Sequence, residues 1–527
     1  MKKITLYGLA SISLVILTTT ACKKELDDQA VPLTQAQNER FGGGLWGRSN
    51  TVFYVLANGN QLDKYNSNYC YNNSPSPSNS TTISGLPSGV TILAIDFRPS
   101  TGQLYGLGSN NSIYVINPET GTSRMIGATP FTPSLSGTIA AFDFNPTVDR
   151  IRVVTSTGQN IRLNPETGSI AAVDGNINGA TGAAISSVAY NNNFSGATTT
   201  TLFDIDPATD KLYRQDPPNN GTLISVGPLN IDVQGEGGFD ISPKGAALAI
   251  YAVNNVSTLL EINLTNGNAE VKATFPGVTY TAIAIPTASV AYAVSSSNEL
   301  LIFGLQPYIG YGGFFNNNTI TKPITGIPAG ESILGMDMRP LNGQIYALGS
   351  NSNIYTINPA SAIATLAYAL TTPLSGTSFG FDFNPTVDRI RIVSNTGQNL
   401  RFNPNDGLLT VDLNLNPGTP SIVAAAYDNN FAGTTTTSLF AIDNVNNKLY
   451  QMNPPNNGTL VEIGSLGVNV PSASGFDIGG TSNNAYAIFK TGYINKIFRV
   501  NTATGNVFYT GLLGTSTING FTVGLGF

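Results

Sequence analysis

The stretch FDFNPTVDRIR at residues 142–152 recurs letter for letter at residues 381–391, 239 positions further along the chain (381 − 142). Three more pairs follow in the same order: TGQNIRLNP at 157–165 with TGQNLRFNP at 396–404, DPPNNGTL at 216–223 with NPPNNGTL at 453–460, and GFDI at 238–241 with GFDI at 475–478. Eleven identical residues followed by matching strings do not arise by chance. The 527-residue chain is therefore a duplication.

Each half contains a shorter repeat, which begins near residues 92, 140, 201 and 237 in the first half. An apolar strand ends in Asp, a turn usually containing Pro follows, a second strand alternates, and a Gly-containing turn leads to a third. Pro presets φ in such a turn, Asn or Asp caps it, and Gly closes it. Strands of about 5 to 8 residues in groups of about 40 are typical of propeller blades rather than of a sandwich.

A fifth unit begins each half. Residues 280–304 have the full strand–turn–strand pattern, whereas residues 44–65 have a weaker first strand. The last residues, FTVGLGF at 521–527, resemble YTAIAIP at 280–286, and we expect them to complete the opening blade so that no sheet edge stays free.

The sequence thus predicts an all-β, propeller-like fold of about ten blade-like units. Propellers typically have 4 to 8 blades, so we expect two tandem five-bladed rings, at residues 44–286 and 287–527. One ring of ten blades is the alternative, because the short link between the strands at 280–286 and 290–297 has the form of a hairpin within one blade.

Composition excludes several classes of function. The net charge is -6 and the 25 Lys and Arg are scattered, so no basic stripe is present for nucleic acid. The chain has no His, which removes the commonest general base and a common metal ligand. No phosphate-binding loop, CxxC metal site or nucleophile elbow is found. We therefore expect no cofactor and no metal.

The N-terminus predicts export. Residues 1–21 have a basic start, an apolar run and small residues before Cys22, and TTTACKKE resembles the lipobox of bacterial lipoproteins. Cys22 would carry the lipid and hold the protein on a membrane, with residues 22–43 as a tether. KKELDD at 23–28 resembles the tract that directs Bacteroidetes-type lipoproteins to the cell surface, or is simply a solvated tether. Cys70 is then unpaired, and an outer-membrane, surface-exposed location is expected.

The ordered strings IDFRP, FDFNPTVDRIR, TGQNxRxNP, PPNNGTL and GFDI resemble the family of unknown function labelled DUF4394, in two copies over about 85–280 and 325–520. The resemblance implies a secreted, propeller-like bacterial protein. It brings no catalytic residues.

Charged residues are concentrated in one unit of each half. Only 11% of the chain is charged, yet ten charged residues stand close together in the two copies of this unit: Asp143, Asp149, Arg150, Arg152, Arg162, Asp382, Asp388, Arg389, Arg391 and Arg401. Arginine forks oriented by Asp would suit an anion or carboxylate ligand. The alternative is a structural ion-pair network. Arg150 and Arg152 share a strand face, but the face of Arg162 depends on hairpin register.

A second acidic run, DIDPATD, places Asp204, Asp206 and Asp210 together. Oxygen ligands at this spacing could suggest a calcium loop. The second copy, AIDNVNN, has Ala441 and Asn447 at two of the three positions, and the glycine and distal carboxylate of an EF-hand are missing. We interpret the run as a turn.

Two classes of function remain. The first is a non-catalytic envelope protein that binds a glycan, peptide or protein through a propeller face. The second is a hydrolase or lyase that uses Asp, Arg or Tyr groups at the ring axis. A pocket of converging carboxylates with raised pKa would favour the enzyme.

Overall fold

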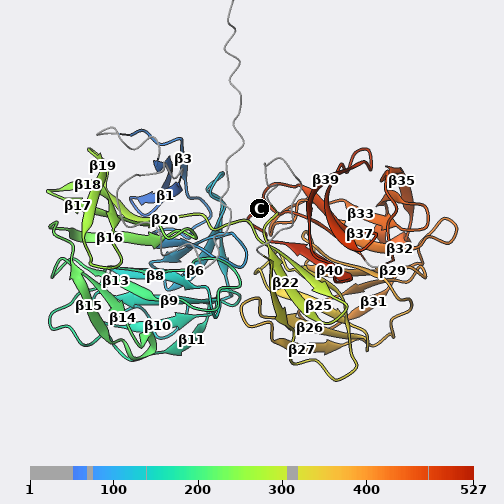
Figure 1. Cartoon of the computed structure of the whole chain (residues 1–527), viewed down its shortest axis with the longest axis horizontal. Coiled ribbons are helices and arrows are strands. Elements are labelled where there is room, and N and C mark those ends of the chain that lie inside the picture. Colours follow the sequence, from blue (N-terminus) through green and yellow to red (C-terminus); the bar gives the residue numbers. More distant parts are fainter. Residues whose placement is uncertain (1–50, 68–74, 138, 306–318, 473) are drawn as a thin grey trace, which may run out of the picture.

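The computed structural model describes residues 51–67, 75–137, 139–305, 319–472 and 474–527. Over these residues the chain forms ten four-stranded antiparallel sheets, which confirms the all-β fold of ten blade-like units. Figure 1 shows the sheets gathered in two rings side by side. The signal peptide, the tether with Cys22, and Cys70 lie outside the described residues. Within the described part, no helix is long and apolar enough to cross a membrane.

The first ring contains five blades. From the axis outward they are β20 (Tyr280–Ala284), β1 (Val52–Ala57), β2 (Gln61–Asn66), β3 (Asn79–Thr82); β4 (Ile92–Phe97), β5 (Leu104–Gly108), β6 (Ser112–Ile116), β7 (Ser123–Ile126); β8 (Ala140–Asn145), β9 (Arg150–Thr155), β10 (Asn160–Leu163), β11 (Ile170–Val173); β12 (Ser187–Tyr190), β13 (Leu202–Asp206), β14 (Lys211–Gln215), β15 (Leu223–Pro228); and β16 (Gln234–Ile241), β17 (Ala247–Val253), β18 (Val256–Ile262), β19 (Ala269–Phe275). A 3₁₀ turn, η3 (Pro218–Asn220), precedes β15.

The second ring repeats this order. From the axis outward its blades are β40 (Ile518–Val523), β21 (Ala291–Ser295), β22 (Glu299–Phe303), β23 (Ile320–Pro323); β24 (Ile333–Met338), β25 (Ile345–Gly349), β26 (Asn353–Ile357), β27 (Ala364–Ala369); β28 (Phe379–Asn384), β29 (Arg389–Ser394), β30 (Asn399–Phe402), β31 (Leu409–Val411); β32 (Ile422–Tyr427), β33 (Leu439–Asp443), β34 (Lys448–Met452), β35 (Leu460–Ser465); and β36 (Ser474–Ile478), β37 (Ala485–Thr491), β38 (Ile494–Val500), β39 (Val507–Leu512). The matching 3₁₀ turn is η4 (Pro455–Asn457).

The innermost strands show that each ring closes after five blades. In the first ring β20, β4, β8, β12 and β16 contact one another in a complete cycle, and in the second ring β40, β24, β28, β32 and β36 do the same. The structure is therefore two five-bladed rings and not one ring of ten.

The closing strands differ from the sequence-based expectation. The opening blade of the chain is completed by β20, whereas the C-terminal strand β40 completes the blade of β21. The stretch 280–297 is accordingly no hairpin, because β20 and β21 lie in different rings. Each closing strand follows the fifth blade of its own ring after a short connection, so the nearest free edge is that of the first blade of the same ring.

Close approach of the innermost strands explains their small residues. A Cβ added at Gly380 would lie 2.7 Å from the Cβ of Ala425 in the next blade, and one at Gly520 would lie 2.7 Å from the Met336 backbone nitrogen. Larger side chains pack between blades further out, where Tyr105 and Phe144 meet edge to face at 5.1 Å. Five strands therefore surround each axis with little room between them.

The two rings also touch each other. The Tyr292 hydroxyl of the second ring donates to the Ser100 carbonyl at 2.8 Å, and the Arg98 guanidinium donates to the Asn342 carbonyl at 3.2 Å. The chain end lies at this junction in Figure 1, where the Gly526 amide donates to the Thr101 carbonyl at 2.8 Å.

Candidate functional site

The charged residues that the sequence groups together separate into three places in the structure. Asp143 lies at the ring axis, Asp149 pairs with an arginine of the preceding blade, and Arg152 and Arg162 share a carboxylate near the outer edge of the third blade. Arg150 only bonds the carbonyl of its neighbour, Asp149, at the turn. They do not form one binding site.

Arg152, which is 1% exposed, bridges the third and fourth blades. Its NH1 donates to Asn160 Oδ1 at 2.7 Å and to Asp174 Oδ2 at 2.6 Å. Its NH2 donates to Asn219 Oδ1 of η3 at 2.7 Å. Arg162 holds both oxygens of the same Asp174, at 2.7 and 2.8 Å. Since Nε also donates to the Tyr190 hydroxyl at 3.3 Å, each nitrogen of the Arg152 guanidinium has a partner inside the protein.

The hairpin register explains why the two arginines meet. Arg152 stands opposite Arg162 in the β9–β10 ladder, so both side chains lie on one face of the blade. Although burial would raise the pKa of Asp174, the hydrogen bonds and charges of the two arginines hold it below its ordinary value. The second ring repeats the network with Arg391, Arg401 and Asp412.

Replacing Arg152 by alanine should destabilise the first ring by about 1 to 4 kcal/mol, because Asp174, Asn160 and Asn219 lose a buried partner. Arg391→Ala is the matched variant in the second ring. Calorimetry should show one of two melting transitions lowered by each substitution. Unchanged melting in both variants would point instead to a ligand-binding role.

Asp149 pairs with Arg98, a residue that is not among the ten charged residues grouped from the sequence. Arg98 donates to both Asp149 oxygens, at 3.0 and 2.5 Å, and to Glu166 at 3.1 Å. In the second ring Arg339 holds Asp388, also through both oxygens. Asp149 is reached at a left-handed turn position with φ of 52°. These pairs tie the second blade of each ring to the third.

At the axis, Asp143 converges with two carboxylates that sequence analysis did not single out. Carboxylate oxygens of Asp96, Asp143 and Asp240 lie within 4.8 Å of one another, as do those of Asp337, Asp382 and Asp477 in the second ring; all six residues are buried. They come from the first, innermost strand of three blades in each ring. We call these two clusters the axial triads.

Each axial carboxylate also accepts a backbone hydrogen bond at the innermost strand of the next blade. Asp96 accepts the backbone N–H of Phe144 at 2.8 Å, and Asp143 accepts that of Tyr190 at 3.0 Å. Asp240 does the same for Ile285. Innermost strands of neighbouring blades share no ladder, so these bonds satisfy edge N–H groups that would otherwise be buried unpaired. This is the local reason for an Asp near the end of the first strand.

Burial and mutual repulsion act on the triads together. Burial raises the pKa of Asp240 to about 7, although the N–H groups of Ile285 and Ile241 oppose it. The pKa of Asp143 is raised well above its ordinary value by burial and then by the negative charges of Asp96 and Asp240. Three ionised carboxylates at this distance are unstable unless protons or a cation join them.

Buried amides adjoin the triads. Asn193 is 0% exposed, and both its amide atoms lack a hydrogen-bond partner. Its N–H side faces Asp240 as a donor without ordinary hydrogen-bond geometry, and it helps to keep the pKa of that carboxyl down. In the second ring, the Oδ1 atom of Asn430 is buried and has no hydrogen-bond partner. The Nδ2 atom of Asn430 donates at 3.4 Å to the carbonyl of Ile478, which is the residue after Asp477. Asp143 Oδ2 is a third unpaired atom.

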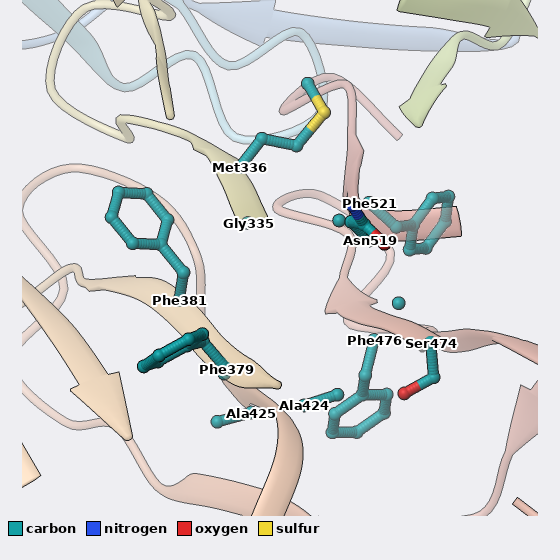
Figure 2. A pocket seen from close by; sticks show the side chains of 13 residues that line it. Gly335, Met336, Phe379, Phe381, Ala424, Ala425, Ser474, Phe476, Asn519 and Phe521 are labelled. Carbon is teal, nitrogen blue, oxygen red and sulfur yellow. The ribbon is translucent and has the colours of Figure 1, made fainter. Parts of the chain in front are cut away.

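The second ring has a hollow on its axis, with an empty volume of about 210 Å³ that includes open solvent. Figure 2 shows residues of all five innermost strands around it, among them Phe381, Phe476 and Phe521. Gly335, Gly380 and Gly475 of its wall each stand two residues before an axial Asp. Backbone, glycine and aromatic groups dominate the hollow.

The DIDPATD run forms a turn. Asp206 Oδ1 accepts the N–H of Ala208 at 2.9 Å and its Oδ2 accepts the Thr209 hydroxyl at 2.6 Å. Asp210 lies at a left-handed position with φ of 51°. Asp204 points elsewhere: it is 0% exposed on β13, and neither oxygen has a partner. The three carboxylates do not share a cation loop.

Four triad members, Asp96, Asp240, Asp337 and Asp477, were missed from the sequence. Their signal was the Asp near the end of the first strand of the repeat, in IDF, FDF and GFDI. Those strands are innermost, so their matching positions face one axis. The ligands are spread over about 140 residues (240 − 96 is 144), so no local motif reveals them.

Fold and site together define a tandem five-bladed β-propeller with a buried acidic triad in each ring. The chain belongs to the family described as "Domain of unknown function (DUF4394)", whose model matches residues 69–284 and 315–522. No curated protein matches the chain.

Solved structures similar to this chain are distant in sequence. One is PorZ, a surface component of the type-IX secretion system of Porphyromonas gingivalis, with 12% identity over 88% of this chain and 58% of that one, at a TM-score of 0.25. A putative 6-phosphogluconolactonase from Bacteroides fragilis has 12% identity over 62% and 93%, at 0.26. The extracellular domain of a putative hybrid two-component system from B. thetaiotaomicron has 10% over 88% and 72%, at 0.26. This similarity concerns the fold alone, and the chain spans little more than half of PorZ.

Proposed function

We propose that this protein is a non-catalytic lipoprotein of the cell envelope that binds a glycan, peptide or protein partner through the surface of its propellers. The observation that carries the proposal is the pairing of its polar side chains. Arg98, Asp149 and Arg152 are each at most 3% exposed. Arg98 donates to Asp149, and Arg152 donates to Asp174. Groups that catalysis would need are thus engaged in holding blades together.

Exposed apolar side chains support a binding role. Leu408, Val411 and Leu413 are 65, 59 and 65% exposed along the outermost strand of the third blade in the second ring. In the first ring the corresponding segment has Val173, at 61%, followed by Asp174 and Gly175. Several apolar side chains exposed close together favour a surface that binds a partner and is shielded from water in the complex.

The anchor is tested at Cys22. Only this cysteine stands at the predicted cleavage point, so Cys22→Ser should abolish acyl labelling and leave the signal peptide attached. Labelling with an alkyne fatty acid, followed by mass spectrometry of the N-terminus, measures both. Lipid on the variant would rule out this part of the proposal.

Binding is tested on residues 23–527 with an array of bacterial glycans and with purified envelope proteins. Saturable binding should be lost when Val411 and Leu413 are both changed to Ser, at an unchanged melting temperature. Val173→Ser is the matched substitution in the first ring. Loss of binding in neither variant, or only together with unfolding, would contradict this surface.

A hydrolase or lyase is the second candidate, and one observation favours it: the axial carboxylates converge and their pKa values are raised. Against it, all six residues are at most 1% exposed, so their carboxylates offer almost no surface to a substrate. Turnover of chromogenic esters, glycosides or uronate polymers that disappears in Asp382→Asn would establish the enzyme and overturn the non-catalytic proposal.

A further inference from the structure

We propose that each axial triad is a binding site for one divalent cation, Ca²⁺, so that the protein holds two ions, one on the axis of each ring. This departs from the absence of metal expected from the sequence. It is independent of the partner-binding function proposed above.

The geometry of the oxygens carries the first step. The oxygens of Asp96, Asp143 and Asp240 lie within 4.8 Å of one another. Oxygens on opposite sides of a Ca²⁺ ion are about 4.6 to 5.2 Å apart, since Ca–O distances are about 2.3 to 2.6 Å. Around Mg²⁺ the same span is only about 4.0 to 4.2 Å. Three oxygens no more than 4.8 Å apart fit within a Ca²⁺ coordination shell, and Ca²⁺ suits a buried site better than Mg²⁺, which usually keeps several of its waters.

The chemistry of the donors points to the same ion. All donors are carboxylates and an adjoining amide, with no nitrogen or sulfur ligand such as zinc or copper prefers. Asp96 and Asp240 accept one backbone N–H at each oxygen, and Asp143 accepts one at Oδ1, so each bonded oxygen uses a single lone pair. The remaining lone pairs are free for a cation.

Unpaired amides are the independent observation. Asn193 has no exposure and no hydrogen bond at either amide atom, while it faces the Asp240 carboxylate. A buried amide left unpaired costs about 1 to 3 kcal/mol, so such a group needs a partner. Turned about its last side-chain bond, the same amide would present Oδ1 to an ion at the triad, because the nitrogen and oxygen of an amide occupy nearly equivalent positions. Asp143 Oδ2, unpaired and buried, would be another ligand.

The second ring repeats the arrangement with its own residues. Asp337, Asp382 and Asp477 form the triad, and the buried Asn430 Oδ1 lacks a partner just as Asn193 does. One difference is Thr522, whose hydroxyl donates to Asp337 Oδ1 at 3.0 Å. A buried amide oxygen without a hydrogen-bond partner therefore recurs in both rings.

The electrostatic argument completes the case. The groups acting on Asp143 are the negative charges of Asp96 and Asp240, while its backbone bond to Tyr190 only partly offsets burial. A cation between the carboxylates turns this repulsion into attraction from three blades at once. The stability of each ring then depends on whether an ion fills its triad, because an ion that binds only the folded ring stabilises that ring.

The test uses the full soluble chain, residues 23–527. Wild-type protein dialysed against EGTA and titrated with CaCl₂ by calorimetry should bind two Ca²⁺ per chain, and elemental analysis should give the same ratio. Both melting transitions should rise on adding CaCl₂, and less on adding MgCl₂ at equal concentration. A ratio of Ca²⁺ to wild-type chain near zero, together with a melting temperature that EGTA does not change, would overturn the proposal. Shared protons, and not an ion, would then offset the charge of the triads.

Variants place the ions. Asp143→Asn and Asp382→Asn should each lower the ratio from two to one, and the double variant should bind none. Asp204→Ala is the matched control: Asp204 is as buried as the triads, and the second ring has Ala441 at this position. Its ratio should stay at two. Two ions in Asp143→Asn would refute the site.

If a triad variant does not fold, crystals of the wild type soaked in TbCl₃ decide the location. Two anomalous peaks on the ring axes, within reach of Asn193 and Asn430, support the proposal. Peaks only elsewhere, or none, count against it.

Discussion

A chain that ends at residue 516 should lose the melting transition of its second ring and keep that of its first. The deleted strand β40 pairs with β21 and contacts β24 and β36. It also brings Ile518, Phe521, Val523 and Leu525 into the core, each at most 3% exposed. At about 1.5 to 3 kcal/mol for each side chain, the loss is about 6 to 12 kcal/mol. That equals the whole stability of a typical domain.

Scanning calorimetry of the purified chain measures both transitions. A peptide of residues 517–527 added in trans should restore the second transition, because it supplies the missing strand. Phe508→Asp is a matched control for Phe521→Asp, since Phe508 is 60% exposed on the outermost strand and Phe521 is 3% exposed. If truncation abolished both transitions equally, the rings would be one cooperative unit.

The repeat pattern was sufficient to predict the blades but not which strands close the rings. Turn chemistry and alternation are local, so FDFNPTVDRIR defined a strand, a turn and a second strand in both halves. Ring closure depends on pairing between strands more than 200 residues apart, such as Tyr54 with Ala284. YTAIAIP and FTVGLGF are alike in sequence, so neither segment indicates with which sheet edge it will pair.

The candidate site was predicted less well, for reasons of side-chain length and long-range packing. Asp143 and Arg152 stand directly opposite in the β8–β9 ladder. The short Asp reaches only to the next innermost strand, whereas the long Arg extends outward to Asp174. The partner of Asp149 is Arg98, 51 residues earlier, and no spacing rule relates them.

Replacing Arg98 by alanine should be the most costly single change in the first ring, about 3 to 5 kcal/mol. Arg98 is 0% exposed and holds two carboxylates, Asp149 and Glu166, in addition to the Asn342 carbonyl of the second ring. Without it both acids lose the guanidinium that donates hydrogen bonds to them, and Asp149 stays buried. The first melting transition should fall, and contact between the rings should weaken.

Arg339→Ala is the internal control, and its effect should be smaller. Arg339 holds Asp388, whose side chain is 23% exposed against 3% for Asp149, and Asn405 takes the place of Glu166. Water can therefore replace the lost guanidinium more easily in the second ring. Equal losses for the two variants would contradict this explanation.

The cost of Arg98→Ala should also depend on pH. Burial alone would raise the pKa of Asp149, but the charge and hydrogen bonds of Arg98 hold it below its ordinary value. A lowered folded-state pKa gives stability that is present above the unfolded pKa of about 4 and is lost as the pH falls through the folded-state value. In the variant burial alone raises this pKa, so the difference between wild type and variant should be largest at neutral pH, begin to shrink above pH 4 and go on shrinking below it.

A triple variant separates the value of the pair from the cost of breaking it. Arg98→Met combined with Asp149→Asn and Glu166→Gln removes the charges together while Asn tolerates the left-handed position, and replacing a buried ion pair by uncharged groups is often close to neutral. It should recover much of the stability that Arg98→Ala loses. If it were as unstable as the single variant, packing of the Arg98 side chain, and not its charge, would be what holds the second blade to the third.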